Sequence, residues 1–249
     1  MEALQITLAN WSLVKKTNDE QQCMGPLFSF VLKQFLEVFG REPLEAEQCV
    51  VYNDSAALFP MLITNRNPIV IRTCAATLQN WAQYIYQLSH ELTHYVIRQY
   101  KTDKDAIVRW LEETLCEAMS LYILRSSSLR WKECLLSSFS TNYCDALSNY
   151  ANNAYNKTAP SVLKKCHTLA DLRAVDASCE TRRIDRSIER NYLLDTFLEY
   201  PENISSFVLY PLYICGDLQI DFSKWKEVGS SPIVSALEAI QPELSSLTA

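Results

Sequence analysis

The sequence is organised around one stretch, Tyr86-Gln87-Leu88-Ser89-His90-Glu91-Leu92-Thr93-His94-Tyr95-Val96-Ile97. His90 and His94 are four residues apart, so on a helix both imidazoles leave the same face, one turn apart. Two ring nitrogens at this spacing can bind one metal ion at roughly 2.0–2.1 Å each. Glu91 follows the first histidine, where its carboxylate can reach a metal-bound water without ligating the metal. The chain has 3 histidines, and two of them stand in this stretch.

The stretch is mostly uncharged, which indicates a buried helix. Leu88, Leu92, Tyr95 and Val96 surround the two histidines and Glu91. Buried imidazoles and a buried carboxylate need partners, and a metal ion supplies them. A solvated helix face that carries these residues by chance is the alternative interpretation, and the apolar surroundings argue against it.

Amino-acid composition and net charge limit the classes of protein to which the chain can belong. The 249 residues are 48% hydrophobic and 21% charged, and the formal net charge is −6. We therefore expect a globular protein with a sizeable core and no basic field for nucleic acid or anionic lipid. The first ten residues lack a signal-peptide pattern, no apolar run reaches membrane-spanning length, and the 9 cysteines form no Cys-x-x-Cys pair. These features predict free thiols, no membrane partner and a cytoplasmic location.

The secondary-structure pattern predicts an α+β protein. We expect a short strand at Leu4–Leu8, a helix from Pro26 to Phe39 that ends at Gly40, and strands near 48–52, 59–64 and 69–73. The three strands suit an antiparallel meander, or a longer crossing in place of the first connection. Helices at about 77–99 and 106–124 follow, the second with Asp103 or Asp105 as N-cap.

The rest of the chain reads as mainly helical. Helical segments are expected at 130–155, 161–174, 183–200 and 232–240, while 205–215 fits either a strand or a buried helix. We expect one catalytic unit over residues 1–249, with an α/β lobe at 1–125 and a mainly helical lobe at 126–249.

A candidate third ligand follows the histidines. Glu113 lies 19 positions after His94 within Trp110-Leu111-Glu112-Glu113. An antiparallel neighbouring helix would bring Glu113 back beside the histidines, and Glu112 is the alternative ligand if the helix is turned by one position. Cys116 is expected to point away from the metal.

This pattern resembles the gluzincin metallopeptidases, the group that includes thermolysin and the alanyl-aminopeptidases. The resemblance covers about residues 68–125 and rests on His-Glu-x-x-His, 18 intervening residues, and Glu inside a Trp-Leu-x-Glu segment. Thr114 stands where those aminopeptidases have glycine, and their Gly-x-Met-Glu-Asn segment is missing upstream, so the resemblance is to the wider group.

The resemblance implies a zincin-like fold, one zinc ion held by His90, His94 and Glu113, and hydrolysis of a peptide or protein substrate. Glu91 would be the general base. Glu117, one helical turn after Glu113, would accept a hydrogen bond from a ligand histidine and so orient it; an ordinary exposed acid is the alternative. The strand 69–73 would lie at the sheet edge and pair with substrate, or would simply be buried.

The resemblance also implies a downstream donor to the oxyanion. His167, Tyr192, Tyr210 and Tyr213 are candidates by position, and we select Tyr192. Two other hypotheses remain open: a catalytically silent or regulatory zinc-binding protein on a peptidase fold, and an all-helical interaction module with an accidental motif.

Overall fold

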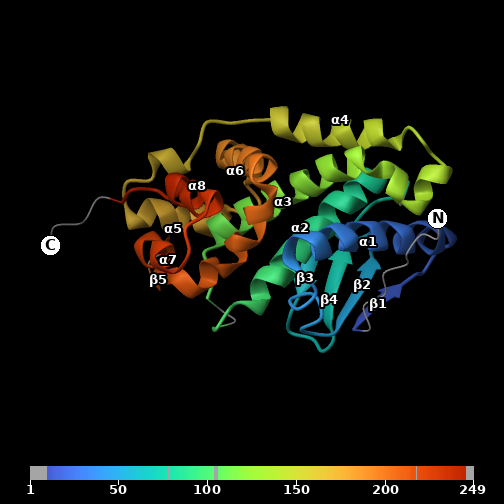
Figure 1. Cartoon of the computed structure of the whole chain (residues 1–249), viewed down its shortest axis with the longest axis horizontal. Coiled ribbons are helices and arrows are strands. Elements are labelled where there is room, and N and C mark those ends of the chain that lie inside the picture. The colour runs from blue at the N-terminus through green and yellow to red at the C-terminus, as the bar shows by residue number, and fades with distance from the viewer. Residues whose placement is uncertain (1–9, 78, 104–105, 217, 245–249) are drawn as a thin grey trace. The chain divides into compact units, whose positions relative to one another are not determined.

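The computed structural model describes residues 10–77, 79–103, 106–216 and 218–244. It is an α+β structure, with a small N-terminal mixed sheet of four strands followed by a mainly helical region (Figure 1), and this confirms the predicted class. The predicted strand at 4–8 lies outside the described residues. Two compact units are found, one comprising 1–99 and 119–154 and the other 100–118 and 155–249. The two predicted lobes are continuous segments that meet at residue 125, whereas each observed unit combines two separate segments of the chain. The prediction that the whole chain forms one catalytic unit stays a prediction.

The sheet of the first unit contains four strands in the order β1-β2-β4-β3. Strand β2 is parallel to both β1 and β4, and β3 is antiparallel to β4. The connection from β2 to β3 therefore passes β4 to reach the far edge, so the antiparallel meander is wrong and the crossing alternative is right. The strands are Trp11–Val14, Cys49–Asn53, Met61–Ile63 and Ile69–Thr73, in chain order β1 to β4.

Strand β4 is internal, because it has a hydrogen-bonded neighbour on each side. The expectation that 69–73 forms the sheet edge is therefore wrong. Its buried run of Ile69, Val70 and Ile71 suits a strand covered on both faces. The edge beyond β4 is β3, where Phe59 and Met61 are exposed.

Helix α1 (Asn18–Phe39) begins earlier than the predicted Pro26. Thr17 and Glu20 form a capping box: the Thr17 side chain accepts the Glu20 N–H at 3.2 Å, and the Glu20 carboxylate accepts the Thr17 N–H at 3.0 Å. Pro26 lies inside the helix. Proline is common in the first turn of a helix, and the prediction of a start at Pro26 rested on that preference. The capping box at Thr17 and Glu20 instead sets the start of the helix eight residues earlier. The helix ends before Gly40, as predicted, with φ of 76° at that glycine.

Helix α2 (Trp81–Gln99) carries the histidine stretch and packs on α1, β3 and β4. Its end matches the prediction and its start is four residues later than the expected 77. Most of the helix is buried, including Tyr95, whose hydroxyl donates to the Glu47 carbonyl at 2.9 Å. The helix therefore lies against the sheet at strands β3 and β4.

Helix α3 (Arg109–Leu129) contributes to both units. It begins after the predicted residue 106 because its cap comes from a distant residue: the Asp176 carboxylate accepts the Trp110 N–H at 2.8 Å. Asp103, one of the two predicted N-caps, precedes the helix by six positions and cannot cap it. The other, Asp105, lies outside the described residues.

The remaining elements are short helices and one small hairpin. The predicted helices at 130–155, 161–174 and 183–200 each begin as 3₁₀ turns, followed by α4, α5 and α6, and segment 205–215 is 3₁₀ helix running into β5. The predicted helix 232–240 is confirmed as α8, and α7 was not predicted. The bounds are α4 Tyr143–Asn156, α5 Leu169–Ser178, α6 Ser187–Glu199, β5 Ile214–Gly216, β6 Gln219–Ile220, α7 Phe222–Val228 and α8 Pro232–Ile240.

Asn53 holds the chain between β4 and α2 in place. This buried amide accepts from the Ala75 N–H and the Thr73 hydroxyl, and it donates to the Ala75 carbonyl, each at 3.0 Å. Gln87 of α2 supports the same segment by accepting the Cys74 N–H at 2.9 Å. The entry of the chain into the histidine helix is therefore fixed by side-chain hydrogen bonds.

We predict that Asn53→Ala destabilises the protein by about 2–3 kcal/mol, because the buried Ala75 peptide groups lose their partners. Urea unfolding followed by circular dichroism measures the loss. Asn65→Ala, at an exposed position, is the matched control and should stay near the wild-type value. Equal stability of the two variants would show that Asn53 does not anchor this segment.

Candidate metal centre

The three central residues of the histidine stretch lie on α2, as the sequence predicted. His90 is 1% exposed and Glu91 is 4% exposed, while His94 is partly buried. Their burial follows from the apolar side chains around them on the helix, including Leu88 and Leu92, which are fully buried. Two imidazoles and a carboxylate thus share a poorly solvated environment.

The two imidazoles converge through the same ring atom. His90 Nε2 and His94 Nε2 are 3.2 Å apart, and the ring centroids are 4.9 Å apart with the planes at 70°. Two ligand nitrogens on one tetrahedral zinc, each at about 2.0–2.1 Å, would stand roughly 3.3 Å apart. The side chains therefore already have the separation that a shared ion requires.

Cys116 of α3 joins the two histidines in one group. The Cys116 Sγ and one ring nitrogen from each histidine all lie within 4.8 Å of one another, and the thiol is fully buried. The expectation that Cys116 points away from the metal is wrong. Positions three and four apart share one face of a helix, so Cys116 lies on the same side of α3 as Glu113. His, His and Cys are all ligand types that zinc accepts, so the donor chemistry fits that metal.

The two adjacent glutamates of α3 are both buried, and the structure separates their roles. The Glu112 carboxylate forms an ion pair with Lys101 Nζ at 2.9 Å and accepts a short hydrogen bond from the Tyr210 hydroxyl. Glu112 is thereby bound inside the second unit, which disfavours it as the alternative ligand. Glu113 is 8% exposed, and its role as third ligand stays a prediction from the motif spacing.

Glu117 is buried, not an ordinary exposed acid, and two arginines lie next to it. Its carboxylate oxygens are 3.5 Å from Arg183 Nε and 3.7 Å from Arg190 Nη1. These ion pairs connect α3 to the segment that leads into α6. The predicted hydrogen bond from a ligand histidine to Glu117 stays a prediction beside this observed role.

The candidate oxyanion donors occupy very different surroundings. Tyr192 on α6 is 47% exposed and His167 is exposed. Tyr210 is fully buried against Glu112, and burial and that carboxylate raise the pKa of Tyr210 well above its usual value. Tyr213 is stacked on Trp225 with ring centroids 5.0 Å apart. Two of the four side chains therefore pack in the interior of the second unit.

Arg190 is a residue that sequence reasoning missed. It is 6% exposed, and its Nε and Nη2 donate to the Asn191 Oδ1 at 3.0 and 2.8 Å. Asn191 in turn donates to the Tyr155 carbonyl at 2.8 Å. The guanidinium beside Glu117 is therefore held in a fixed orientation. Nothing in the local sequence distinguishes this arginine from its neighbours Arg182, Arg183 and Arg186.

All nine cysteines are free thiols, as predicted. Burial raises the pKa of Cys49 and of Cys179 to about 12, and that of Cys134 to about 11. These thiols stay protonated and unreactive at neutral pH. No helix among the described residues combines the length and the apolarity needed to cross a bilayer.

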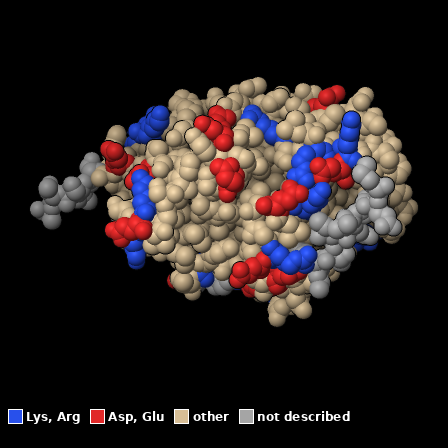
Figure 2. Space-filling model, viewed as in Figure 1, with Lys and Arg blue, Asp and Glu red and all other residues tan. Residues whose placement is uncertain are grey.

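The charged surface agrees with the composition. On the face shown in Figure 2, acidic and basic side chains are interspersed. The absence of a nucleic-acid partner stays a prediction that rests on the net charge.

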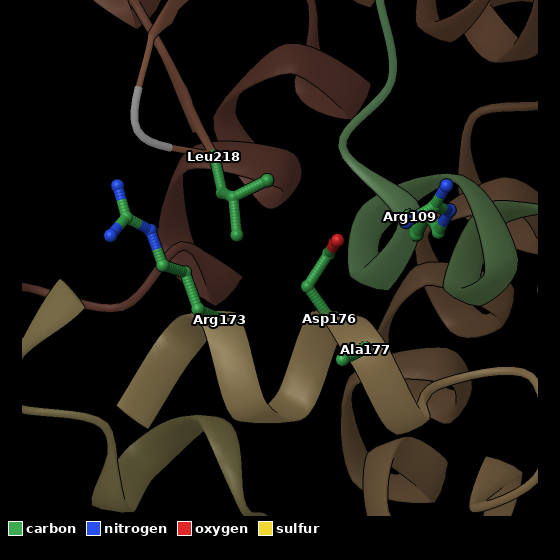
Figure 3. A pocket seen from close by; sticks show the side chains of 5 residues that line it. All are labelled: Arg109, Arg173, Asp176, Ala177 and Leu218. Atoms are coloured by element: carbon green, nitrogen blue, oxygen red, sulfur yellow. The ribbon is translucent and has the colours of Figure 1, made fainter. Parts of the chain in front are cut away.

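A cavity of about 360 Å³ lies in the second unit, at the start of α3. Figure 3 shows Arg173, Asp176 and Ala177 along α5, with Leu218 facing them and Arg109 at the first turn of α3. Asp176 is already engaged as the cap of α3. The cavity contains none of the predicted metal ligands.

Comparison of the chain with protein-family models, curated proteins and solved structures finds no match.

We predict that the purified protein binds about one zinc ion per molecule and that His90→Ala and His94→Ala each abolish binding. Glu113→Gln should weaken zinc binding more than Glu112→Gln, because Glu112 is engaged by Lys101 and Tyr210. Atomic absorption after dialysis against a weak chelator gives the stoichiometry, and competition with a chromophoric chelator gives the affinity.

Cys116→Ser tests the third member of the group. Cobalt substitution reports the thiolate directly, because sulfur ligation adds a near-ultraviolet charge-transfer band that oxygen and nitrogen ligands lack. Full zinc occupancy in both histidine variants would refute a metal centre at this position.

Proposed function

We propose that this protein is a zinc-dependent peptidase. The observation that supports this best is the 3.2 Å approach of the two Nε2 atoms on a buried helix, with Glu91 directly following His90. His90, His94 and Glu113 would hold the zinc ion, and the ion would supply a water of lowered pKa at its open position. The family pattern quoted from the sequence adds the reaction type, peptide hydrolysis.

Glu91 is the residue that moves protons in this proposal. Its carboxylate accepts a proton from the attacking water and delivers it to the leaving amine, so the residue is unchanged after each turnover. Burial of Glu91 at 4% exposure excludes bulk water, which would otherwise compete for the proton.

The edge of the sheet supports a peptide substrate. Strand β3 pairs with β4 on one side only among the described strands, and it packs on α2. An extended peptide can add to such an edge through main-chain hydrogen bonds, with alternate side chains facing the protein. The exposed Phe59 and Met61 offer apolar contacts beside that edge.

Arg190 is a second candidate oxyanion donor on α6, beside Tyr192. It is buried beside Glu117, which follows Cys116 in the chain, and Asn191 fixes its orientation. Tyr192, selected from the sequence, lies two positions later, on the opposite side of the helix, and is 47% exposed. A preorganised cationic donor is also suited to a developing negative charge.

Cys116 supports a second candidate function, a zinc site that is structural or regulatory. A thiolate, two imidazoles and Glu113 together would complete four protein ligands and leave no position for water. The two functions differ in whether Cys116 binds the metal in the native protein.

We predict that Glu91→Gln lowers kcat by about 10²–10⁴-fold and leaves the zinc content unchanged, because it removes the base but no ligand. A quenched fluorescent peptide library and labelled casein serve as substrates. Glu42→Gln, at an exposed position, is the matched control. Zinc-loaded protein that cleaves no peptide and shows cobalt–thiolate absorption would favour the structural site over the peptidase.

The two oxyanion candidates give a separate prediction. Arg190→Met should lower kcat by about 10²–10³-fold with little change in KM, the scale for removing one donor to the transition state. Tyr192→Phe should stay within about twofold of wild type. Arg183→Met removes the other cation beside Glu117 and controls for loss of that ion pair. A large loss in Tyr192→Phe alone would restore the tyrosine as the donor.

A further inference from the structure

A second, smaller cavity in the second unit contains a buried arginine. Its volume is about 110 Å³, and it lies between α5 and the 3₁₀ turn that precedes α6. Arg186, Arg182 and Asp185 contribute the charged part of the lining, and Ala174 contributes part of the remainder. None of these residues belongs to the candidate metal centre.

The guanidinium of Arg186 is buried with uncharged partners. The residue is 2% exposed; its Nε donates to the Thr114 hydroxyl at 3.0 Å and its Nη2 to the Cys179 carbonyl at 2.9 Å. Among the described residues, no hydrogen bond of Nη1 and no carboxylate within ion-pair distance of this guanidinium is found. A buried charge without an adjacent counterion is costly, so this arrangement calls for an anion.

The nearby acids are already engaged. Asp185 pairs with Arg182 at 2.8 Å, and Asp176 caps α3. The charged lining of the cavity contains two arginines and one aspartate, and Asp176 interacts with the Arg186 guanidinium only from beyond ion-pair distance.

We propose that this cavity binds a small oxyanion, with Arg186 Nη1 and the Arg182 guanidinium as donors. A cavity of about 110 Å³ has room for several waters, and therefore for phosphate or a small carboxylate. Charge-assisted hydrogen bonds from a planar guanidinium match either anion.

The larger cavity of Figure 3 does not share this property. Arg109 and Arg173, which line it, are both exposed, and its buried acid already caps α3. The two cavities lie on different faces of α5, since Arg173, Asp176 and Ala177 line one and Ala174, Val175 and Ser178 line the other. Arg173 therefore offers a matched control arginine on the same helix.

The test is isothermal titration of the full chain with sodium phosphate and, separately, sodium acetate, with ionic strength held constant by sodium chloride. We expect saturable binding of at least one anion at concentrations up to about 10 mM. Arg182→Ala should weaken binding about 5–10-fold, because one charged donor is lost. Ala174→Leu should abolish binding by filling the cavity, and its exposed position on α5 spares the core. Arg173→Ala should bind within about twofold of wild type.

Two results would overturn the inference: no saturable binding of either anion, or equal affinity in the wild type, Arg182→Ala and Ala174→Leu. Tighter binding of phosphate than acetate identifies a tetrahedral ligand, and the reverse identifies a carboxylate. The inference does not depend on the metal centre, so it holds or fails separately from the proposed function.

Discussion

Two imidazole nitrogens held 3.2 Å apart on one buried helical face are the constraint on which the site depends. A neutral imidazole has one donor and one acceptor nitrogen, so two facing Nε2 atoms are compatible only as opposite tautomers or as joint ligands. Protonation of either ring would place a charge in an environment that solvates it poorly. Joint ligation removes both difficulties, because each nitrogen then offers its lone pair to the same cation. The burial of α2 in the first unit therefore favours joint ligation of one metal ion by the two histidines.

Helix α3 shows how several buried acids coexist. Successive residues of a helix point about 100° apart, so neighbours along the chain meet different partners. Glu112 meets Lys101 and Tyr210, Thr114 accepts from Arg186, and Glu117 meets two arginines. Each charge is thereby compensated by its own cation. Glu113, between Glu112 and Thr114, is the acid of this helix that the motif assigns to the metal.

The fold was predictable from sequence where local signals decide and unpredictable where distant residues decide. The ends of α1 and α2 and the whole of α8 follow from glycine, proline and apolar spacing. The parallel pairing of β2 with β4 does not follow from these local signals. Parallel strands need a long crossover connection, and here that connection contains another strand, β3, so the order of strands along the chain differs from their order in the sheet. The start of α3 is another case, since its cap, Asp176, lies 66 residues away from Trp110. The local sequence pattern therefore predicts that a helix or strand exists. Hydrogen bonds to residues far away in the chain determine where it starts and which strand it pairs with.

The same division applies to the site. His90, Glu91 and His94 were found from sequence because a helix alone brings them together. The prediction that Cys116 points away from the metal was wrong because it counted too few residues on the metal-facing side of α3. Cys116 is three positions after Glu113, and residues three apart lie on the same side of a helix. Arg190 and Arg186 carry no local signal, since their importance arises from burial against α3, more than 70 positions earlier in the chain. The role of a buried arginine can be inferred only when the structure shows whether a carboxylate lies next to it. Glu117 lies next to Arg190, whereas among the described residues no carboxylate lies within ion-pair distance of Arg186. This difference is why we assign one arginine to the proposed reaction and the other to a separate ligand.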